Sequence, residues 1–244
     1  MKDEDVKINI SDAGNLVVDD TMAVATVLSS DDLVQSLDEL AAEVLSFCAN
    51  RSIDKIKVVG IAKACLPIMT TMIFLLGKRC IDYDFLILES YKKDKRSDNI
   101  TVRYKPKVKF CKNEVILVID TMLDTGHTMK KAVEIIGDLG AKFVITCALL
   151  KKNRTDGICV YPHLNFIGYS VPDVFMAGYG LDHDGAYRNV PGIYNTMEFD
   201  KYKHDKEILD TIIYNNIDYE ETIEEEIEED GEDYGESDES DINA

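Results

Sequence analysis

The sequence predicts an α/β fold in which a central parallel sheet of about five strands is flanked by helices. An apolar run at 115–119 is typical of a strand buried on both faces. Apolar residues at helical spacing follow at 129–139, and a second apolar run comes at 143–150. A strand, a helix and a strand in this order form a right-handed crossover unit. The ligand site of such a unit lies beyond the carboxyl end of its first strand.

The other elements are predicted from the same periodicities. Ser30 can cap the first helix, and Gly140 is placed to end the helix of the crossover unit. Apolar residues recur at helical spacing in three segments and form short continuous runs in two others. The expected elements are a helix at 31–49, a strand at 56–62, a helix at 67–76, a strand starting at 85–88 and a short helix at 207–214.

Two carboxylates and a Thr/Gly-rich turn follow the strand at 115–119. The turn offers backbone amides, two threonine hydroxyls and the positive end of a helix dipole, which together suit a phosphate monoester. Gly126 lets the backbone come close to that group. Asp120 and Asp124 would repel a phosphate unless they face sugar hydroxyls, a metal ion or a ring nitrogen. Capping the helix needs one acid rather than two, so the pair favours a phosphosugar site.

The segment 115–129, VILVIDTMLDTGHTM, resembles the phosphoribosyl pyrophosphate (PRPP) motif of type I phosphoribosyltransferases, particularly their hypoxanthine-guanine branch. Three further matches occur in the family's order: the Ser90-Tyr91 pair of a mobile loop, the strand end 149–152, and the purine-binding region 165–188. The similarity covers residues 27–199. It implies the type I phosphoribosyltransferase fold with a small hood region. One motif would indicate only a fold, whereas four in sequence indicate a reaction.

The resemblance implies a role for each matching residue. Asp124 would exchange the purine N7 proton, and Asp120 would bind the ribose hydroxyls. Lys152 would donate to O6 of the base while Phe175 stacks on its ring, which selects 6-oxopurines over adenine. The remaining assignments are PRPP and phosphate binding by Thr121, Thr125, Gly126, His127, Thr128, Lys63, Ala64 and Arg188, base binding by Met176 and Asp182, and Mg²⁺ binding by Asp182 and Asp120.

The implied reaction is purine salvage, in which hypoxanthine or guanine and PRPP give IMP or GMP and pyrophosphate. Loss of pyrophosphate from C1′ passes through an oxocarbenium-like state. The reaction therefore depends most on cations that neutralise the negative charge of the leaving pyrophosphate. Mg²⁺, Lys63 and Arg188 would supply that charge. The family also implies a homodimer or homotetramer, with PRPP and a 6-oxopurine as ligands. No nucleic-acid or membrane partner is expected.

Three departures from the family pattern leave an alternative open. Thr121 stands where a second acid is usual, Ala64 where glycine follows the loop lysine, and His127 where the phosphate turn has lysine. A catalytically weak nucleotide-binding or regulatory protein would also fit. Taken singly, Lys152 could be a solvent-facing lysine and Phe175 a core residue. A third possibility is that the acidic tail is the functional part, as a docking segment.

Composition predicts a cytoplasmic protein of three parts. Its six cysteines have no CxxC pairs, and no apolar run reaches the roughly 18 residues of a membrane span. The net charge is −19, but 218–244 holds fifteen acidic residues and no Lys or Arg, leaving 31 acidic and 27 basic residues elsewhere. We therefore expect a loose N-terminal segment at 1–15, a phosphoribosyltransferase domain at 16–217 and a disordered acidic tail at 218–244.

Overall fold

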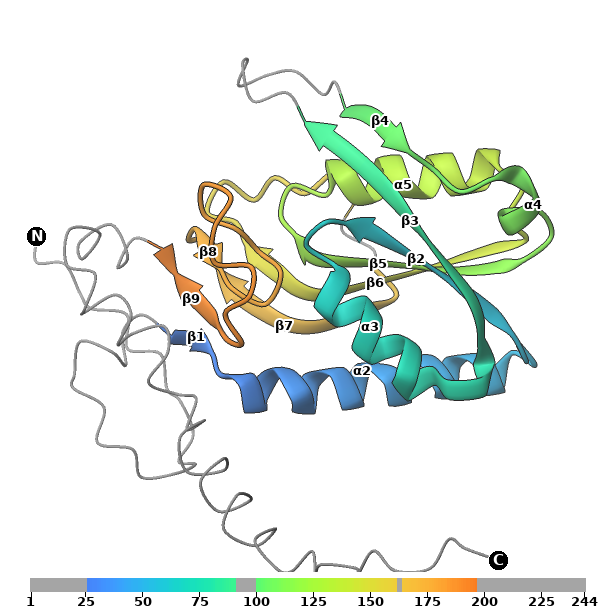
Figure 1. The fold of residues 1–244 in the computed structure, drawn as a ribbon, viewed down its shortest axis with the longest axis horizontal. Helices are drawn as coiled ribbons and strands as arrows, with labels where there is room; N and C mark the ends of the chain where they lie inside the picture. The colour runs from blue at the N-terminus through green and yellow to red at the C-terminus, as the bar shows by residue number, and fades with distance from the viewer. Residues whose placement is uncertain (1–25, 91–99, 162–163, 197–244) are drawn as a thin grey trace, which may run out of the picture. The chain divides into compact units, whose positions relative to one another are not determined.

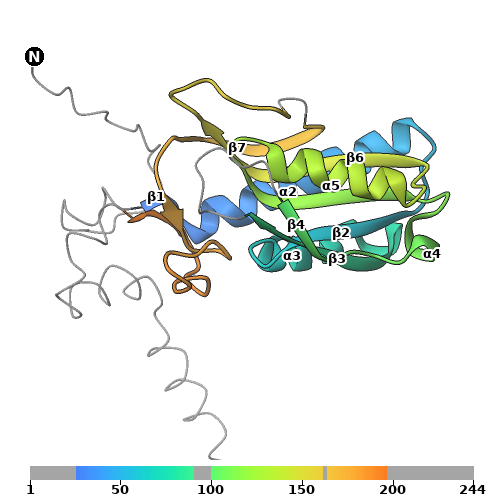
Figure 2. The same cartoon turned by 90° about the horizontal axis from the view of Figure 1, so that it is seen from above.

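The computed structural model of the chain describes residues 26–90, 100–161 and 164–196 (Figure 1). Within them, the predicted α/β architecture is confirmed. Six strands form the larger sheet in the order β4-β3-β2-β5-β6-β7 (Figure 2). Five of these strands are parallel, and β4 joins one edge antiparallel. The strands are β2 (Ile56–Ala62), β3 (Cys80–Ser90), β4 (Ile100–Tyr104), β5 (Val115–Leu123), β6 (Phe143–Asn153) and β7 (Phe166–Pro172).

Helices cover both faces of this sheet (Figure 1). On one face α2 and α3 pack in a core cluster that includes Leu37, and on the other α5 packs in a second cluster that includes Ile136. Covered faces on both sides explain the continuous apolar run at the start of the central strand β5. In β5, Leu117 belongs to the first cluster and its neighbour Val118 to the second. The helical segments are α2 (Ser30–Asn50), α3 (Leu66–Leu76), η1 (Gly77–Arg79), α4 (Val108–Cys111) and α5 (His127–Asp138).

Helix α2 is capped by Ser29, and the predicted cap at Ser30 is wrong by one residue. The Ser29 hydroxyl accepts a hydrogen bond from the Asp32 amide at 3.2 Å, and the Asp32 carboxylate accepts one from the Ser29 amide at 3.0 Å. This reciprocal capping box satisfies two amides at the helix start. Ser30 is therefore already the first helical residue.

A second, three-stranded sheet with the order β1-β9-β8 corresponds to the expected hood. It consists of β1 (Thr26–Leu28), β8 (Met176–Ala177) and β9 (Ile193–Asn195). This sheet and its loops lie on the side toward which the carboxyl ends of β5, β6 and β7 point (Figure 1). The hood therefore faces the edge of the main sheet where a ligand site is expected.

The structure also extends several predicted elements. The strand at 56–62 has the predicted bounds, whereas β3 begins at Cys80 rather than Phe85, and β5 and β6 run on to Leu123 and Asn153. No helix in the described ranges is long and apolar enough to span a membrane. The predictions for 1–15, 207–214, 218–244 and Tyr91 lie outside the described residues.

Candidate active site

A tight turn joins the carboxyl end of β5 to α5. Gly126 occupies the N-cap position with a φ of 83°, in the left-handed region that favours glycine. A Cβ at this position would lie 2.8 Å from the backbone nitrogen of Tyr161. Gly126 has no side chain with which to cap α5, so the helix start, at His127 and Thr128, can present its amides to an anion. Thr125 binds the same neighbouring segment, since its carbonyl accepts from the Val160 amide at 2.8 Å.

Asp120 lies inside β5, before the turn that contains Gly126. Burial raises the pKa of its carboxyl from 3.8 to about 7, although the Thr121 and Met122 amides act in the opposite direction. The Thr121 amide donates to Asp120 Oδ1 at 2.8 Å. Thr121 itself is completely buried, and its hydroxyl oxygen has no hydrogen-bond partner in the described part of the chain. Because successive side chains of a strand point to opposite faces, the Asp120 carboxyl and the Thr121 hydroxyl lie on opposite sides of β5.

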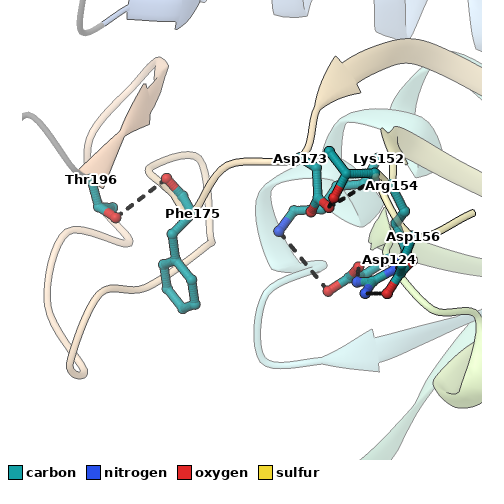
Figure 3. A network of polar contacts seen from close by, with 8 residues as sticks. Asp124, Lys152, Arg154, Asp156, Asp173, Phe175 and Thr196 are labelled. Carbon is teal, nitrogen blue, oxygen red and sulfur yellow. Dashed lines mark hydrogen bonds and ion pairs between the residues drawn. The ribbon is translucent and has the colours of Figure 1, made fainter. Parts of the chain in front are cut away.

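Asp124 follows β5 and faces two cations that come from and just after β6 (Figure 3). Nη1 of Arg154 lies 2.5 Å from Asp124 Oδ1, and Nζ of Lys152 lies 3.9 Å from Oδ2. The carboxylate is still 42 % exposed, so a ligand can reach it. Lys152 is only 8 % exposed, which excludes the simple reading of a solvent-facing lysine.

An exposed aromatic ring lies on the other side of Lys152. The Nζ of this lysine is 5.8 Å from the centroid of the Phe175 ring, and Phe175 is 53 % exposed rather than part of the core (Figure 3). The hood fixes the backbone here, because the Thr196 amide donates to the Phe175 carbonyl at 2.9 Å. Met176 is buried and pairs with Asn195 in the small sheet. Asp124, Lys152 and Phe175 thus form one group, which we call the base cluster.

The loop after β2 forms a second group with the hood. Strands β2 and β5 are parallel neighbours, so this loop opens at the same edge as Asp120. Lys63 in it is exposed and follows a cis peptide bond from Ala62. The Ala64 carbonyl oxygen would lie 2.0 Å from a Cβ on Gly180, which has a φ of +94°. The hood therefore contacts this loop at a point where only glycine fits.

Arg188 and Asp182 lie on the hood side of that contact, next to Gly180. The Arg188 guanidinium donates to the Gly180 carbonyl at 2.6 Å and lies 2.6 Å from the Asp182 carboxylate. Asp182 also accepts from the Gly185 amide at 3.0 Å. Among the described residues, no group of three or more His, Cys, Asp or Glu side chains is placed to hold a metal ion unaided. Asp182 and Asp120 thus each offer a single carboxylate.

Asp120 and Thr121 lie in β5, and the other predicted site residues, apart from the Ser90-Tyr91 pair, fall into these two groups and the turn. Ser90 is the last residue of β3. The Ser90 side chain and the whole of Tyr91 lie outside the part of the chain that the structure describes, so the assignment of this pair to a mobile loop stays a prediction. Sequence reasoning missed Arg154, its partner Asp156, and Asp173, which accepts hydrogen bonds from Thr155. A signal was present, because the run Asn-Arg-Thr-Asp-Gly after Lys152 puts a cation and an acid in a turn at the end of a strand.

Comparisons with known proteins find relatives of this chain. The family model described as phosphoribosyl transferase domain matches residues 23–158. A hypoxanthine-guanine phosphoribosyltransferase of Aquifex aeolicus is 29% identical over 168 residues, which are 69% of this chain and 92% of the relative. A similar enzyme of Mycoplasma genitalium is 27% identical over 165 residues, or 64% of this chain and 89% of that protein.

Solved structures show the same fold. A hypoxanthine phosphoribosyltransferase of Staphylococcus aureus superposes with a TM-score of 0.60 and 24% identity, covering 70% of this chain and 89% of the other. The enzyme from Trypanosoma cruzi, in complex with the product IMP, gives a TM-score of 0.61 at 16% identity, with coverage of 70% and 92%.

Proposed function

The chain belongs to the phosphoribosyl transferase domain family, and from this premise we propose that it is a purine salvage transferase. It converts hypoxanthine or guanine and PRPP to IMP or GMP and pyrophosphate. The names of the relatives that match along most of their length support this substrate pair. The structural observation that carries the proposal is the base cluster, because it matches the polar edge of a 6-oxopurine.

A 6-oxopurine presents an acceptor at O6 next to the ring nitrogen N7. In the base cluster, the Lys152 ammonium lies 3.9 Å from the Asp124 carboxylate and 5.8 Å from the Phe175 ring centroid. A purine stacked on that ring would offer O6 to Lys152 and N7–H to Asp124. Adenine carries an amino group where the ammonium requires an acceptor, so two hydrogen-bond donors would face each other.

The phosphosugar would bind across the turn after β5. The amides that open α5 and the hydroxyls of Thr125 and Thr128 suit the 5′-phosphate. Asp120 faces the ribose hydroxyls in this arrangement, and its pKa of about 7 allows it to accept or donate a hydrogen bond near neutral pH. Lys63 and Arg188 come from the two loops that meet at Gly180, where they would bind the pyrophosphate.

The transfer needs one proton acceptor. The bond from C1′ to the pyrophosphate oxygen breaks and a bond from N9 to C1′ forms, so the base must lose its N7 proton. Asp124 takes this proton and later releases it to solvent. The pyrophosphate leaves with its electron pair, and the cationic side chains on its oxygens stabilise the charge.

The carboxylates fit a magnesium ion bound together with the substrate. Mg²⁺ usually keeps several waters and takes only one or two protein carboxylates plus phosphate oxygens. Asp182 and Asp120 would each offer one carboxylate to such an ion. When bound, the ion would neutralise charge on the leaving pyrophosphate. Asp182 would hold it while Arg188, already 2.6 Å from that carboxylate, binds the adjacent phosphate.

The test of the proposal is a comparison of two adjacent lysines in a turnover assay. We expect Lys152→Gln to lower kcat/KM for hypoxanthine and guanine by about 100-fold, because a buried charge-assisted hydrogen bond to O6 is lost. Lys151→Gln is the matched control on the same strand and should stay within about twofold of the parent. Equal losses in the two variants would remove the proposed role of Lys152, and a parent protein without turnover would remove the proposed function.

The proposal also covers the cell compartment and the oligomeric state of the enzyme. We place the enzyme in the cytoplasm, in agreement with its six free-thiol cysteines, none of which is paired in the structure. We also infer a homodimer or homotetramer. Several large apolar side chains are exposed and would be covered by a second copy, among them Leu66, Phe74 and Tyr83. Light scattering of the purified chain tests this assembly.

A further inference from the structure

We propose that a cavity at the amino edge of the main sheet binds a small phosphorylated ligand with an aromatic ring, such as a nucleoside diphosphate. This amino-edge cavity has a volume of about 470 Å³, and its walls are the segments 51–55, 113–115 and 142–143. It lies where β2, β5 and β6 begin, at the end of the sheet away from the hood (Figure 1). Ligand cavities usually have volumes of about 300–1,000 Å³, so the space is sufficient. The inference goes beyond the proposed function, because it assigns a second ligand.

The amino-edge cavity is distinct from the candidate active site, because the two lie at opposite ends of the same strands. Strand β5 begins at Val115 in the cavity wall and ends at Leu123, before the turn that opens α5. At about 3.3 Å per residue, this strand spans roughly 25 Å. Strand β6 likewise begins at Phe143 in the wall and leads to Lys152. A ligand in the cavity would therefore not overlap PRPP or a purine.

Positive charge predominates in the wall of the cavity. The charged residues of the wall are three cations and two acids: Arg51, Lys55, Lys142, Asp54 and Glu114. The carboxylate of Glu114 is already neutralised from outside the wall, since its Oε1 lies 3.1 Å from Lys57 Nζ. The three cations therefore outnumber the one acid that Lys57 does not neutralise. This balance favours an anionic ligand.

Arg51 is oriented by stacking on an aromatic ring. Its guanidinium carbon lies 3.7 Å from the centroid of the Phe47 ring. That ring is held in turn by an edge contact with Phe166, at 5.5 Å between centroids. A guanidinium stacked on a ring keeps its N–H donors at its edge, where they can bind two phosphate oxygens at once. The cavity thus has one cation in place before a ligand binds.

Phe143 gives the cavity an aromatic surface next to these cations. It belongs to the wall and is 42 % exposed. Its ring lies nearly parallel to that of Phe47, with an angle of 19° between the planes and 6.2 Å between the centroids. Phe47 therefore supports the ring, and its exposed part can stack on a flat base. An aromatic ring beside three cations favours a ligand that carries both a base and a phosphate over a bare phosphate.

Backbone hydrogen bonds hold the walls of the cavity in place. The Ile53 amide donates to the Cys48 carbonyl at 2.9 Å, and the Lys142 amide donates to the Glu114 carbonyl at 2.8 Å. The first of these bonds also satisfies a carbonyl at the end of α2, which would otherwise repel an anion. A ligand therefore meets walls that need little ordering when it binds.

The test is a calorimetric titration of the full chain with ADP, which combines an aromatic base with a diphosphate. We expect Lys142→Gln to weaken the binding of ADP by about tenfold, because a charge-assisted hydrogen bond to a phosphate is lost. Lys107→Gln is the matched control, since this lysine is exposed before α4 and lies outside the cavity wall. Its affinity should stay within about twofold of the parent. No binding by the parent, or equal affinities of the parent and Lys142→Gln, overturns the inference.

Two further variants show which part of the ligand is bound and at which end of the sheet. Phe143→Leu removes the aromatic ring, so it should weaken the binding of ADP by about fivefold and leave that of pyrophosphate unchanged. An unchanged affinity for ADP in this variant contradicts the role of the ring. Lys63→Gln alters the candidate active site and should leave the binding of ADP in the cavity unchanged. A loss of ADP binding in Lys63→Gln but not in Lys142→Gln places ADP in the active site and overturns the inference.

NMR of the ¹⁵N-labelled parent locates the ligand without any variant. On addition of ADP, the amide signals of Ser52, Asn113 and Lys142 should shift, because these residues form the cavity wall. Shifts confined to the turn at 125–128 would overturn the inference. The outcome is independent of the proposed function, since a parent protein without turnover can still bind ADP at the amino edge of the sheet.

Discussion

Asp124 is the single side chain on which the proposed chemistry depends most. Asp124→Asn removes the proton acceptor but keeps the size of the side chain, so we expect kcat to fall by about 100-fold or more. Binding of PRPP should persist, because the phosphate turn is unchanged. Steady-state kinetics and calorimetry measure the two effects. Asp38→Asn, on the exposed face of α2, is the control and should behave like the parent. Unchanged turnover in Asp124→Asn would contradict the assignment.

The raised pKa of Asp120 predicts that the stability of the protein depends on pH. Burial raises the pKa of this carboxyl from 3.8 to about 7 in the folded protein, so the native state keeps its proton over a range where the unfolded chain has lost it. The free energy of unfolding should therefore decrease as the pH rises from about 4 to about 7. Asp120→Asn removes this penalty.

Thermal unfolding of the parent and Asp120→Asn at several pH values measures the effect. The variant should unfold at the same temperature as the parent at pH 4, and at a higher temperature by pH 8. The difference between the two proteins isolates this residue from other groups that titrate in the same range. A difference that stays constant across the range would show that Asp120 titrates normally.

Individual site residues differ in how far the sequence could place them. Asp120 and Asp124 were predictable because they follow an apolar strand directly. Lys152 and Phe175 are 23 positions apart in the sequence, and only the resemblance to a family assigned them to the same site. In the structure, Nζ of Lys152 lies 5.8 Å from the centroid of the Phe175 ring. Arg154 escaped prediction because its contact with Asp124 depends on how two separate loops approach each other, which no local pattern encodes.

The contact between two loops gives a prediction at the level of elements. Gly180→Ala would put a Cβ 2.0 Å from the Ala64 carbonyl oxygen, so the hood and the loop after β2 must separate. We expect the KM for PRPP to rise by about tenfold, because misplaced binding groups weaken an oriented site. Stability should also decrease by about 1–3 kcal/mol, since the backbone conformation there disfavours a side chain.

Gly185→Ala is the matched control for the conformational part of this effect. Gly185 has a φ of +86° in the same hood loop, but no atom lies within 4 Å of a Cβ built on it. Both variants should lose stability, whereas only Gly180→Ala should change the KM for PRPP. A similar rise of KM in both would show that backbone conformation, not the contact with Ala64, is responsible.

The regular elements of the main sheet were largely predictable, whereas the individual strands of the hood were not. Strand β2 matched its predicted bounds because four of its residues form a continuous buried run, Val58 to Ile61. The first half of β3, Cys80–Asp84, alternates acidic and apolar residues, so it resembled a loop. Strands β1, β8 and β9 have only two or three residues each, and long-range pairing rather than local sequence defines them.

For the whole molecule, every described site residue lies between Lys63 and Arg188. Deleting the acidic segment 218–244 should therefore leave kcat/KM within about twofold of the parent and the unfolding temperature nearly unchanged. The same assay and a thermal melt check both expectations. A loss of turnover of more than about tenfold on this deletion would mean that the tail takes part in the reaction.

The most direct measurement is a stoichiometric assay of the purified full chain with PRPP, Mg²⁺ and one base at a time. With hypoxanthine or guanine, we predict that pyrophosphate and the nucleotide 5′-monophosphate form in equal amounts over many turnovers, whereas adenine gives neither. Binding of PRPP without release of pyrophosphate with either 6-oxopurine would contradict the proposed transfer and leave a nucleotide-binding protein in its place.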